Sequence, residues 1–139
     1  MDQKALVDTS FLYALADSSD RAHPAAVNLL DETELALWVP TVVIPEAAYL
    51  IGARLGYDAL RQFVRWSAGP LIRLEEITQA DLLRVEAIMT QYADARFDFV
   101  DTAIMALAER LDIRTVFTFD QRDFRVFRLQ HCEHLAIEP

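Results

Sequence analysis

The sequence predicts an α/β fold, a three-layer α/β/α domain with a central parallel sheet of four to five strands. Three observations predict it. Short apolar runs alternate along the chain with longer amphipathic segments, which is the pattern of parallel strands joined by helices. Carboxylates end two of these apolar runs. Finally, the 139 residues suffice for one core and contain no linker or repeat, so residues 1–139 are expected to form a single domain.

In the first half of the chain, the apolar runs 5–8 and 35–39 are predicted strands. Helices are predicted between and after them, over residues 11–16, 25–30, 41–55 and 57–67. Thr9 and Ser10 can cap the first helix, and Pro24 stands near the first turn of the second. The apolar side of the fourth helix is expected to carry Leu60, Phe63, Val64 and Trp66.

In the second half, residues 71–74 are a predicted strand, and Thr78 with Asp81 resembles a capping box that opens the next helix. The apolar stripe of that helix is expected to be Leu82, Val85, Met89 and Tyr92. A helix beginning at Asp98 follows, because apolar residues recur there at three- and four-residue spacings. The remaining elements are predicted as a buried strand, a turn and a last edge strand, over residues 115–119, 120–124 and 135–137.

Composition limits the class of protein. The net charge is −9, so a plain basic footprint for nucleic acid is absent. Hydrophobic residues make up 53% of the chain, which predicts a buried protein–protein surface and a homodimer. No apolar run approaches the ~18 residues that span a bilayer, and the first residues lack the pattern of a signal peptide. Cys132 is the only cysteine; we therefore expect a cytoplasmic protein without a disulfide.

Acidic residues gather at one edge of the predicted sheet. Asp8 and Asp120 end two strands, Asp98 and Asp101 begin a helix, and Glu46 lies early in the helix that follows the second strand. Strand ends and helix starts share one rim in a parallel sheet. Carboxylates that meet there would repel unless a hard divalent cation held them, and such a cation can activate water for phosphodiester hydrolysis. Taken singly, each acid could instead be a cap, a helix-dipole partner, a turn residue or a solvated side chain.

Four motifs lie in order along nearly the whole chain. They are LVDTSFL at 6–12, VVIPEAAYL at 42–50, FVDTAI at 99–104 and VFTFDQRDF at 116–124. In this order and spacing they resemble the PIN-domain ribonucleases, particularly the VapC-like toxins of type II toxin–antitoxin pairs. Each motif alone is weak, and the four together are fairly specific.

The resemblance implies a metal-dependent endoribonuclease that hydrolyses RNA phosphodiester bonds, with Mg²⁺ or Mn²⁺ as cofactor. It also implies a homodimer and a cognate antitoxin protein that covers the site. The acidic quartet would be Asp8, Glu46, Asp101 and Asp120, of which all but Glu46 would hold the metal. Residues expected to support these acids are Thr9, Ser10, Asp98 and Thr118.

Other polar residues leave alternatives open. Arg122, Arg125 and Arg128 follow Asp120 and could contact RNA phosphates or form a solvated face. The segment from His131 to His134 could suggest zinc, although no second cluster accompanies it.

Three other functions compete with the nuclease. A phosphoacceptor signalling domain also gathers acids, but it is expected to need a lysine on the same rim, and Lys4 begins the first strand at the opposite end. The others are a metal-dependent phosphatase of small substrates and a non-catalytic PIN-type scaffold for RNA or protein. Activity measured with and without Mg²⁺ separates a scaffold from an enzyme.

Overall fold

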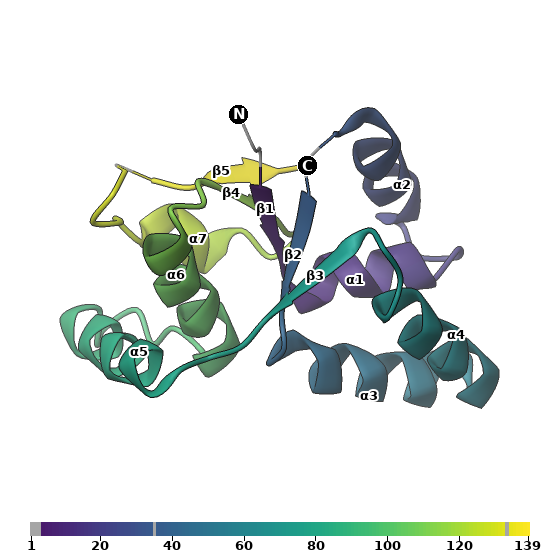
Figure 1. Cartoon of the computed structure of the whole chain (residues 1–139), viewed down its shortest axis with the longest axis horizontal. Coiled ribbons are helices and arrows are strands. Elements are labelled where there is room, and N and C mark those ends of the chain that lie inside the picture. The colour runs from purple at the N-terminus through teal and green to yellow at the C-terminus, as the bar shows by residue number, and fades with distance from the viewer. Residues whose placement is uncertain (1–3, 35, 133) are drawn as a thin grey trace.

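The computed structural model describes residues 4–34, 36–132 and 134–139, and its strands form one parallel sheet (Figure 1). The strand order is β3-β2-β1-β4-β5, and each neighbouring pair runs parallel. The strands are β1 (Lys4–Val7), β2 (Ala36–Pro40), β3 (Ile72–Glu75), β4 (Thr115–Phe117) and β5 (Ala136–Glu138). The predicted α/β class and parallel sheet are therefore confirmed. Leu35, the predicted first residue of the second strand, and Glu133 of the C-terminal cluster lie outside the described residues.

Helices cover both faces of the sheet. In Figure 1, α1 to α4 gather on one side of the strands and α5 to α7 on the other. The helices are α1 (Thr9–Ala16), α2 (His23–Glu32), α3 (Val43–Leu55), α4 (Tyr57–Ser67), α5 (Gln79–Gln91), α6 (Phe99–Leu111) and α7 (Arg122–Val126). None of the helices in these described segments is long and apolar enough to cross a lipid bilayer.

Helix α6 is the most deeply buried helix and carries Asp101 in its first turn. Every residue from 101 to 108 is buried, so the helix packs on all sides rather than along one stripe. Ile104 and Leu107 are fully buried, as are Leu6 of β1 and Phe117 of β4. A carboxylate at the start of this helix is therefore held by the core itself.

The C-terminal part of the chain differs from the prediction in two places. Residues 120–124 were predicted as a turn, but α7 forms at 122–126. It forms because Phe124 is fully buried and Arg128 donates hydrogen bonds to the last carbonyl oxygens of the helix. Strand β4 ends at Phe117 rather than at Phe119. Beyond it, the backbone N–H groups of Phe119 and Asp120 donate to side-chain hydroxyls instead of a neighbouring strand.

Two predicted apolar faces are partly wrong. Leu82 is 46% exposed and Val64 is 56% exposed, so neither belongs to the buried side of its helix. The other predicted members do face the core: Val85 and Phe63 are buried, and the partly buried ones that pack against it are Met89, Tyr92, Leu60 and Trp66. Each predicted stripe therefore holds for three of its four residues, and α5 adds Ile88, which was not predicted.

Ion pairs tie α5 and the end of β3 to α6. The Arg110 Nε atom lies 2.9 Å from Asp81 Oδ1, and Arg110 Nη2 lies 3.1 Å from Glu75 Oε1. Asp81 is itself the third residue of a capping box with Thr78, as the sequence predicted. Burial raises the pKa of the Asp81 carboxyl, but the hydrogen bonds from Arg110 and Thr78 outweigh burial and lower it. A second pair joins Arg84 to Glu109 at 2.6 Å.

Replacing Arg110 by Met should destabilise the protein, because it leaves the buried Asp81 carboxylate without its charged donor. We expect the free energy of unfolding to fall by about 2–3 kcal/mol. Arg114→Met is the matched control, since Arg114 pairs with Asp112 where both side chains are more than 60% exposed, and it should cost less than about 0.5 kcal/mol. Urea unfolding measures both changes. Equal destabilisation by the two variants would show that the Arg110 network does not fix α6.

Candidate active site

Asp8 stands where β1 ends and α1 begins, and both of its carboxylate oxygens accept hydrogen bonds. Oδ1 accepts from the backbone N–H of Phe11 at 3.0 Å and from the Ser10 hydroxyl at 2.7 Å. Oδ2 accepts from the Thr118 hydroxyl. Asp8, rather than Thr9 or Ser10, is therefore the residue that caps α1. Only 3% of Asp8 is exposed, so its carboxylate is held in a fixed orientation.

Ser10 and Thr118 join the end of β4 to Asp8. The Ser10 hydroxyl accepts from the backbone N–H of Phe119 at 2.9 Å, and the Thr118 hydroxyl accepts from the N–H of Asp120 at 2.9 Å. Each hydroxyl thus donates its proton to the Asp8 carboxylate. The oxygen of each hydroxyl accepts a hydrogen bond from the backbone N–H of Phe119 or Asp120. Thr9 makes no such contact, because its hydroxyl is buried with no hydrogen-bond partner in the described structure.

Asp98 and Asp101 share the start of α6 but differ in burial. Asp98 is exposed and caps the helix, accepting from the N–H of Asp101 at 2.8 Å. Its backbone carbonyl also accepts from the Thr102 hydroxyl at 2.5 Å. Asp101 is only 6% exposed. Asp98 therefore has the capping role that was predicted for it as an alternative. The Asp101 carboxyl, in contrast, is largely shielded from solvent.

The pKa values of Asp101 and Asp8 indicate which other acids lie near them. Burial, followed by the charges of the neighbouring carboxylates of Asp98, Asp8, Asp120 and Asp123, raises the pKa of Asp101 to about 8. Burial also raises the pKa of Asp8 to about 6, although the hydrogen bonds from Thr118, Phe11 and Ser10 oppose this rise and Asp120 adds to it. Asp8, Asp101 and Asp120 therefore lie within one electrostatic neighbourhood, on the rim that the sequence predicted.

Asp123 is a member of this neighbourhood that the sequence analysis did not select. Its side chain is hydrogen-bonded to that of Asp101, and burial followed by the charges of Asp120 and Asp98 raises its pKa against the opposing effect of Arg122. The residue was missed because 120–124 was predicted as a turn. The available signal was its position three residues after Asp120. Residues three apart lie on the same side of a helical turn, so this spacing would have placed Asp123 near Asp120 if α7 had been predicted.

Glu46 is not in contact with the other acids. It lies in the first turn of α3, as predicted, and its side chain is exposed. Within the described part of the chain it makes no hydrogen bond or ion pair, and it is not among the charges acting on Asp8 or Asp101. A solvated carboxylate gains nothing by approaching three like charges unless a cation lies between them.

The donor set suits a hard divalent cation by chemistry. Carboxylate oxygens are the ligands that Mg²⁺ prefers. The four charged groups that raise the pKa of Asp101 are all carboxylates. As the side chains stand, however, no three His, Cys, Asp or Glu residues in segments 4–34, 36–132 and 134–139 are grouped so that they could hold a metal ion. A bound cation would offset the charge of these carboxylates.

The three arginines after Asp120 have different partners. Arg128 caps α7 and does not face the acids as a free cation. Arg125 donates to Gln121 within its own helix. Arg122 donates to the backbone carbonyl of Ala95 at 3.3 Å and has an exposed side chain. Lys4 packs 4.8 Å above the Trp38 ring at the start of β1, at the end of the strand opposite to Asp8.

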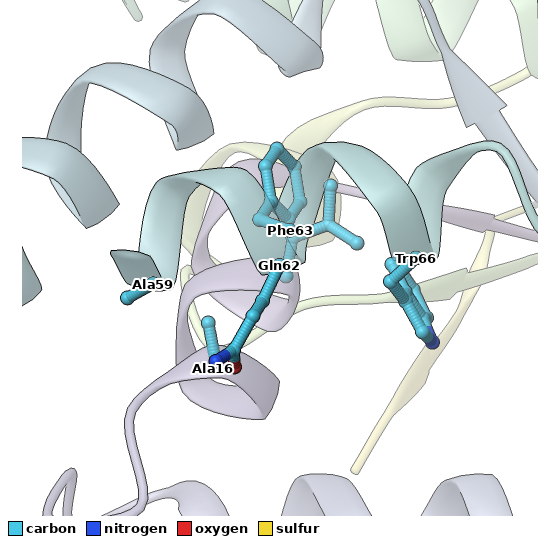
Figure 2. Close-up of a pocket in the computed structure, with 6 residues that line it drawn as sticks. Ala16, Ala59, Gln62, Phe63 and Trp66 are labelled. Atoms are coloured by element: carbon cyan, nitrogen blue, oxygen red, sulfur yellow. The ribbon is translucent and has the colours of Figure 1, made fainter. Parts of the chain in front are cut away.

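A separate apolar pocket lies between α1 and α4 (Figure 2). Of its aromatic lining residues, Phe63 is buried and Trp66 is only partly buried. Helix α1, which begins beside Asp8, forms one wall. The lining residues are Leu12, Ala16, Ala59, Gln62, Phe63 and Trp66.

Comparison with known proteins finds relatives by sequence. A family model described as PIN domain matches residues 5–128. The chain is 34% identical over 123 residues to Ribonuclease VapC26 of Mycobacterium tuberculosis, and this alignment covers 88% of the chain and 91% of that protein.

Solved structures share the fold. VapC20 of Mycobacterium tuberculosis, described as a sarcin-ricin loop cleaving toxin, gives a TM-score of 0.79 at 22% identity and covers 85% of this chain and 91% of its own. FitAcB from Neisseria gonorrhoeae gives 0.72 at 17% identity, with 97% and 96% covered. A toxin–antitoxin complex from Klebsiella pneumoniae gives 0.67 at 19% identity, with 89% and 92% covered.

Removing the charge of Asp101 should stabilise the metal-free protein. Because its folded pKa lies above that of the unfolded chain, stability is present below the unfolded value near 3.8 and is lost as the pH rises towards 8. In EDTA, we expect Asp101→Asn to exceed wild type in free energy of unfolding by on the order of 2–4 kcal/mol at pH 8, and by less at pH 5.

Thermal and urea unfolding across this pH range provide the measurement. Asp112→Asn is the matched control, because Asp112 is exposed and ends α6 in a left-handed conformation that Asn accepts. A pH-independent difference between wild type and Asp101→Asn would contradict the placement of Asp101 among like charges.

Proposed function

The chain belongs to the PIN domain family, and on this premise we propose that it is a metal-dependent endoribonuclease, the toxin of a toxin–antitoxin pair. The observation that carries the proposal is the group of carboxylates around the buried Asp101. A relative that is 34% identical is a ribonuclease by name, and three of the four motifs that resemble the family contain Asp8, Asp101, Asp120 and Asp123. The reducing cytoplasm is the compartment we propose, in keeping with the single cysteine.

Asp8, Asp101 and Asp120 would hold the cation, directly or through water. Mg²⁺ or Mn²⁺ bound there supplies an activated water and offsets negative charge on the phosphoryl oxygens. The residues of the chain do the positioning. Ser10 and Thr118 fix the orientation of the Asp8 carboxylate and the backbone before Asp120, as expected for residues that support the acids.

Glu46 and Asp123 have different proposed roles. Glu46 would orient the attacking water or complete the group of acids, which requires its exposed side chain to turn towards Asp8 once the cation is present. Asp123 contacts Asp101 directly and would help hold that carboxylate. The loss of protons from these acids accompanies cation binding, so activity should fall at acidic pH.

The other functions find less support in the structure. A phosphoacceptor domain needs a lysine on the acidic rim, and Lys4 is engaged with Trp38 at the opposite end of β1. A non-catalytic scaffold has no use for several carboxylates held against one another at a cost in stability. Cleavage assays separate both from a nuclease.

Purified protein should cleave a mixed RNA pool in Mg²⁺ or Mn²⁺ and lose this activity in EDTA. Asp101→Asn should reduce the rate by at least ~100-fold, because it removes one charge from the group that holds the cation. Asp112→Asn, which also removes one carboxylate but lies at the far end of α6, should cleave like wild type. Equal cleavage by wild type and Asp101→Asn would place the activity elsewhere or in a contaminant. If wild type binds cation by calorimetry yet cleaves nothing, the scaffold function replaces the enzyme.

We also propose an antitoxin partner and a homodimer. Three of the solved structures that share the fold are described as VapBC or as a toxin–antitoxin complex. The apolar pocket between α1 and α4 (Figure 2) offers a partner a place for a hydrophobic side chain, on the helix that begins at the acids. Self-association is supported by large apolar side chains that are more than 70% exposed, namely Tyr49, Tyr57 and Leu83.

Ala16→Arg should weaken the complex with the antitoxin encoded beside the gene and leave RNA cleavage unchanged, because a charged side chain would enter the pocket. Asp20→Arg, on the loop just after α1, is the control for added charge. Sedimentation of the protein alone and with its partner measures both assemblies. Retained binding by Ala16→Arg would exclude the pocket, and a purely monomeric protein at micromolar concentration would exclude the homodimer.

A further inference from the structure

Arg96 holds a strained backbone conformation just before the acidic site. Its φ is +52°, in the left-handed region where a side chain is unfavourable and glycine is not. Asp112 is also left-handed, but it ends α6, where this conformation is common. Arg96 ends no helix, since the preceding helix α5 closes at Gln91. Arg96 instead follows the turn at 92–95, which a hydrogen bond from the Ala95 N–H to the Tyr92 carbonyl closes, and a left-handed residue away from a helix end invites a functional explanation.

The loop around Arg96 is anchored on both sides. Phe97 is buried and its ring lies 5.1 Å from that of Tyr92, which in turn lies 5.6 Å from the ring of Phe127. On the other side, Arg122 donates to the carbonyl of Ala95 at 3.3 Å. These contacts hold the loop, so the exposed Arg96 side chain emerges at a fixed position two residues before Asp98, the cap of α6.

The side chain of Arg96 is exposed. In the described residues its side chain makes no hydrogen bond and no ion pair, whereas Arg84 and Arg110 each pair with carboxylates. Arg122 reaches the same loop, leaves 78% of its side chain exposed, and approaches Asp123 only to 3.8 Å. In a chain of net charge −9, the exposed side chains of Arg96 and Arg122 thus leave the segment just before α6 and the first turn of α7, the two helix starts that carry Asp98 and Asp123.

We propose that Arg96 and Arg122 form an arginine rim that binds backbone phosphates of a single-stranded RNA next to the bond to be cut. This inference rests on the proposed nuclease function and specifies how the substrate is held. A guanidinium presents paired N–H donors that match a phosphate. A polyanion that approaches an acidic protein needs such local cations. Contacts to phosphate carry no base information, so the rim should act on all sequences alike.

The test measures RNA binding separately from cleavage. A short, fluorescently labelled single-stranded RNA of mixed sequence is titrated by anisotropy with Asp101→Asn protein in Mg²⁺, at several salt concentrations. Arg96→Gly, Arg96→Asn and Arg122→Gln are added to this parent. Arg65→Gln, in the last turn of α4 and also exposed, is the matched control for lost charge.

We expect each change at Arg96 or Arg122 to lower the affinity about fivefold at roughly 0.1 M salt, and to lower the slope of log K against log salt by about 0.7. Arg65→Gln should change neither quantity. Because Gly and Asn accept a positive φ, Arg96→Gly and Arg96→Asn should melt at the same temperature as their parent or higher. A loss of binding without a loss of stability excludes a merely structural role.

Two failures are distinguishable. If the parent binds RNA and wild type cleaves it, but Arg96→Asn and Arg122→Gln keep the affinity and salt slope of the parent, the arginine rim is overturned and the nuclease function stands. If the parent binds no RNA and wild type cleaves none, the proposed function fails, and the rim fails with it.

Discussion

Like charges confined to one edge of the sheet are the constraint on which the rest of the structure depends. Asp101 is almost fully buried among other carboxylates, and both burial and the neighbouring like charges make its ionised form unfavourable. Either protons or a cation must offset the charge. The fold therefore has to be stable enough elsewhere to hold these groups together when neither is fully bound.

The elements around the acids supply that stability in two ways. Hydrogen bonds orient Asp8, whose two oxygens accept from Phe11, Ser10 and Thr118. Packing fixes Asp101, because every residue of α6 from 101 to 108 is buried. The salt bridges of Arg110 and Arg84 then hold α6 against α5. Strain at a site is tolerated when its surroundings determine the geometry completely, and this arrangement meets that condition.

Charge is distributed unevenly in a way that suits a negatively charged substrate. The chain as a whole is acidic, and the acids of the site would repel a phosphodiester. A bound cation would reverse the sign at the point of reaction, while exposed arginines beside the loop at Ala95 would act on the flanking phosphates. Without substrate and cation, the close carboxylates lower the stability of the folded protein, in keeping with the raised pKa values of Asp8 and Asp101.

The sequence by itself determined the fold class and predicted that Asp8, Asp101 and Asp120 lie on one rim. Apolar runs indicate strands and three- and four-residue spacings indicate helices, and chain direction in a parallel sheet places strand ends and helix starts together. Only the tertiary structure decided which neighbours those acids have. The burial of Phe124 converts a predicted turn into α7 and brings Asp123 to Asp101, and the fold leaves Glu46 exposed. Such contacts join residues far apart in the chain, and local periodicity contains no information about them. The positive φ of Arg96 could not be predicted either, because arginine, unlike glycine, gives no local signal for a left-handed conformation.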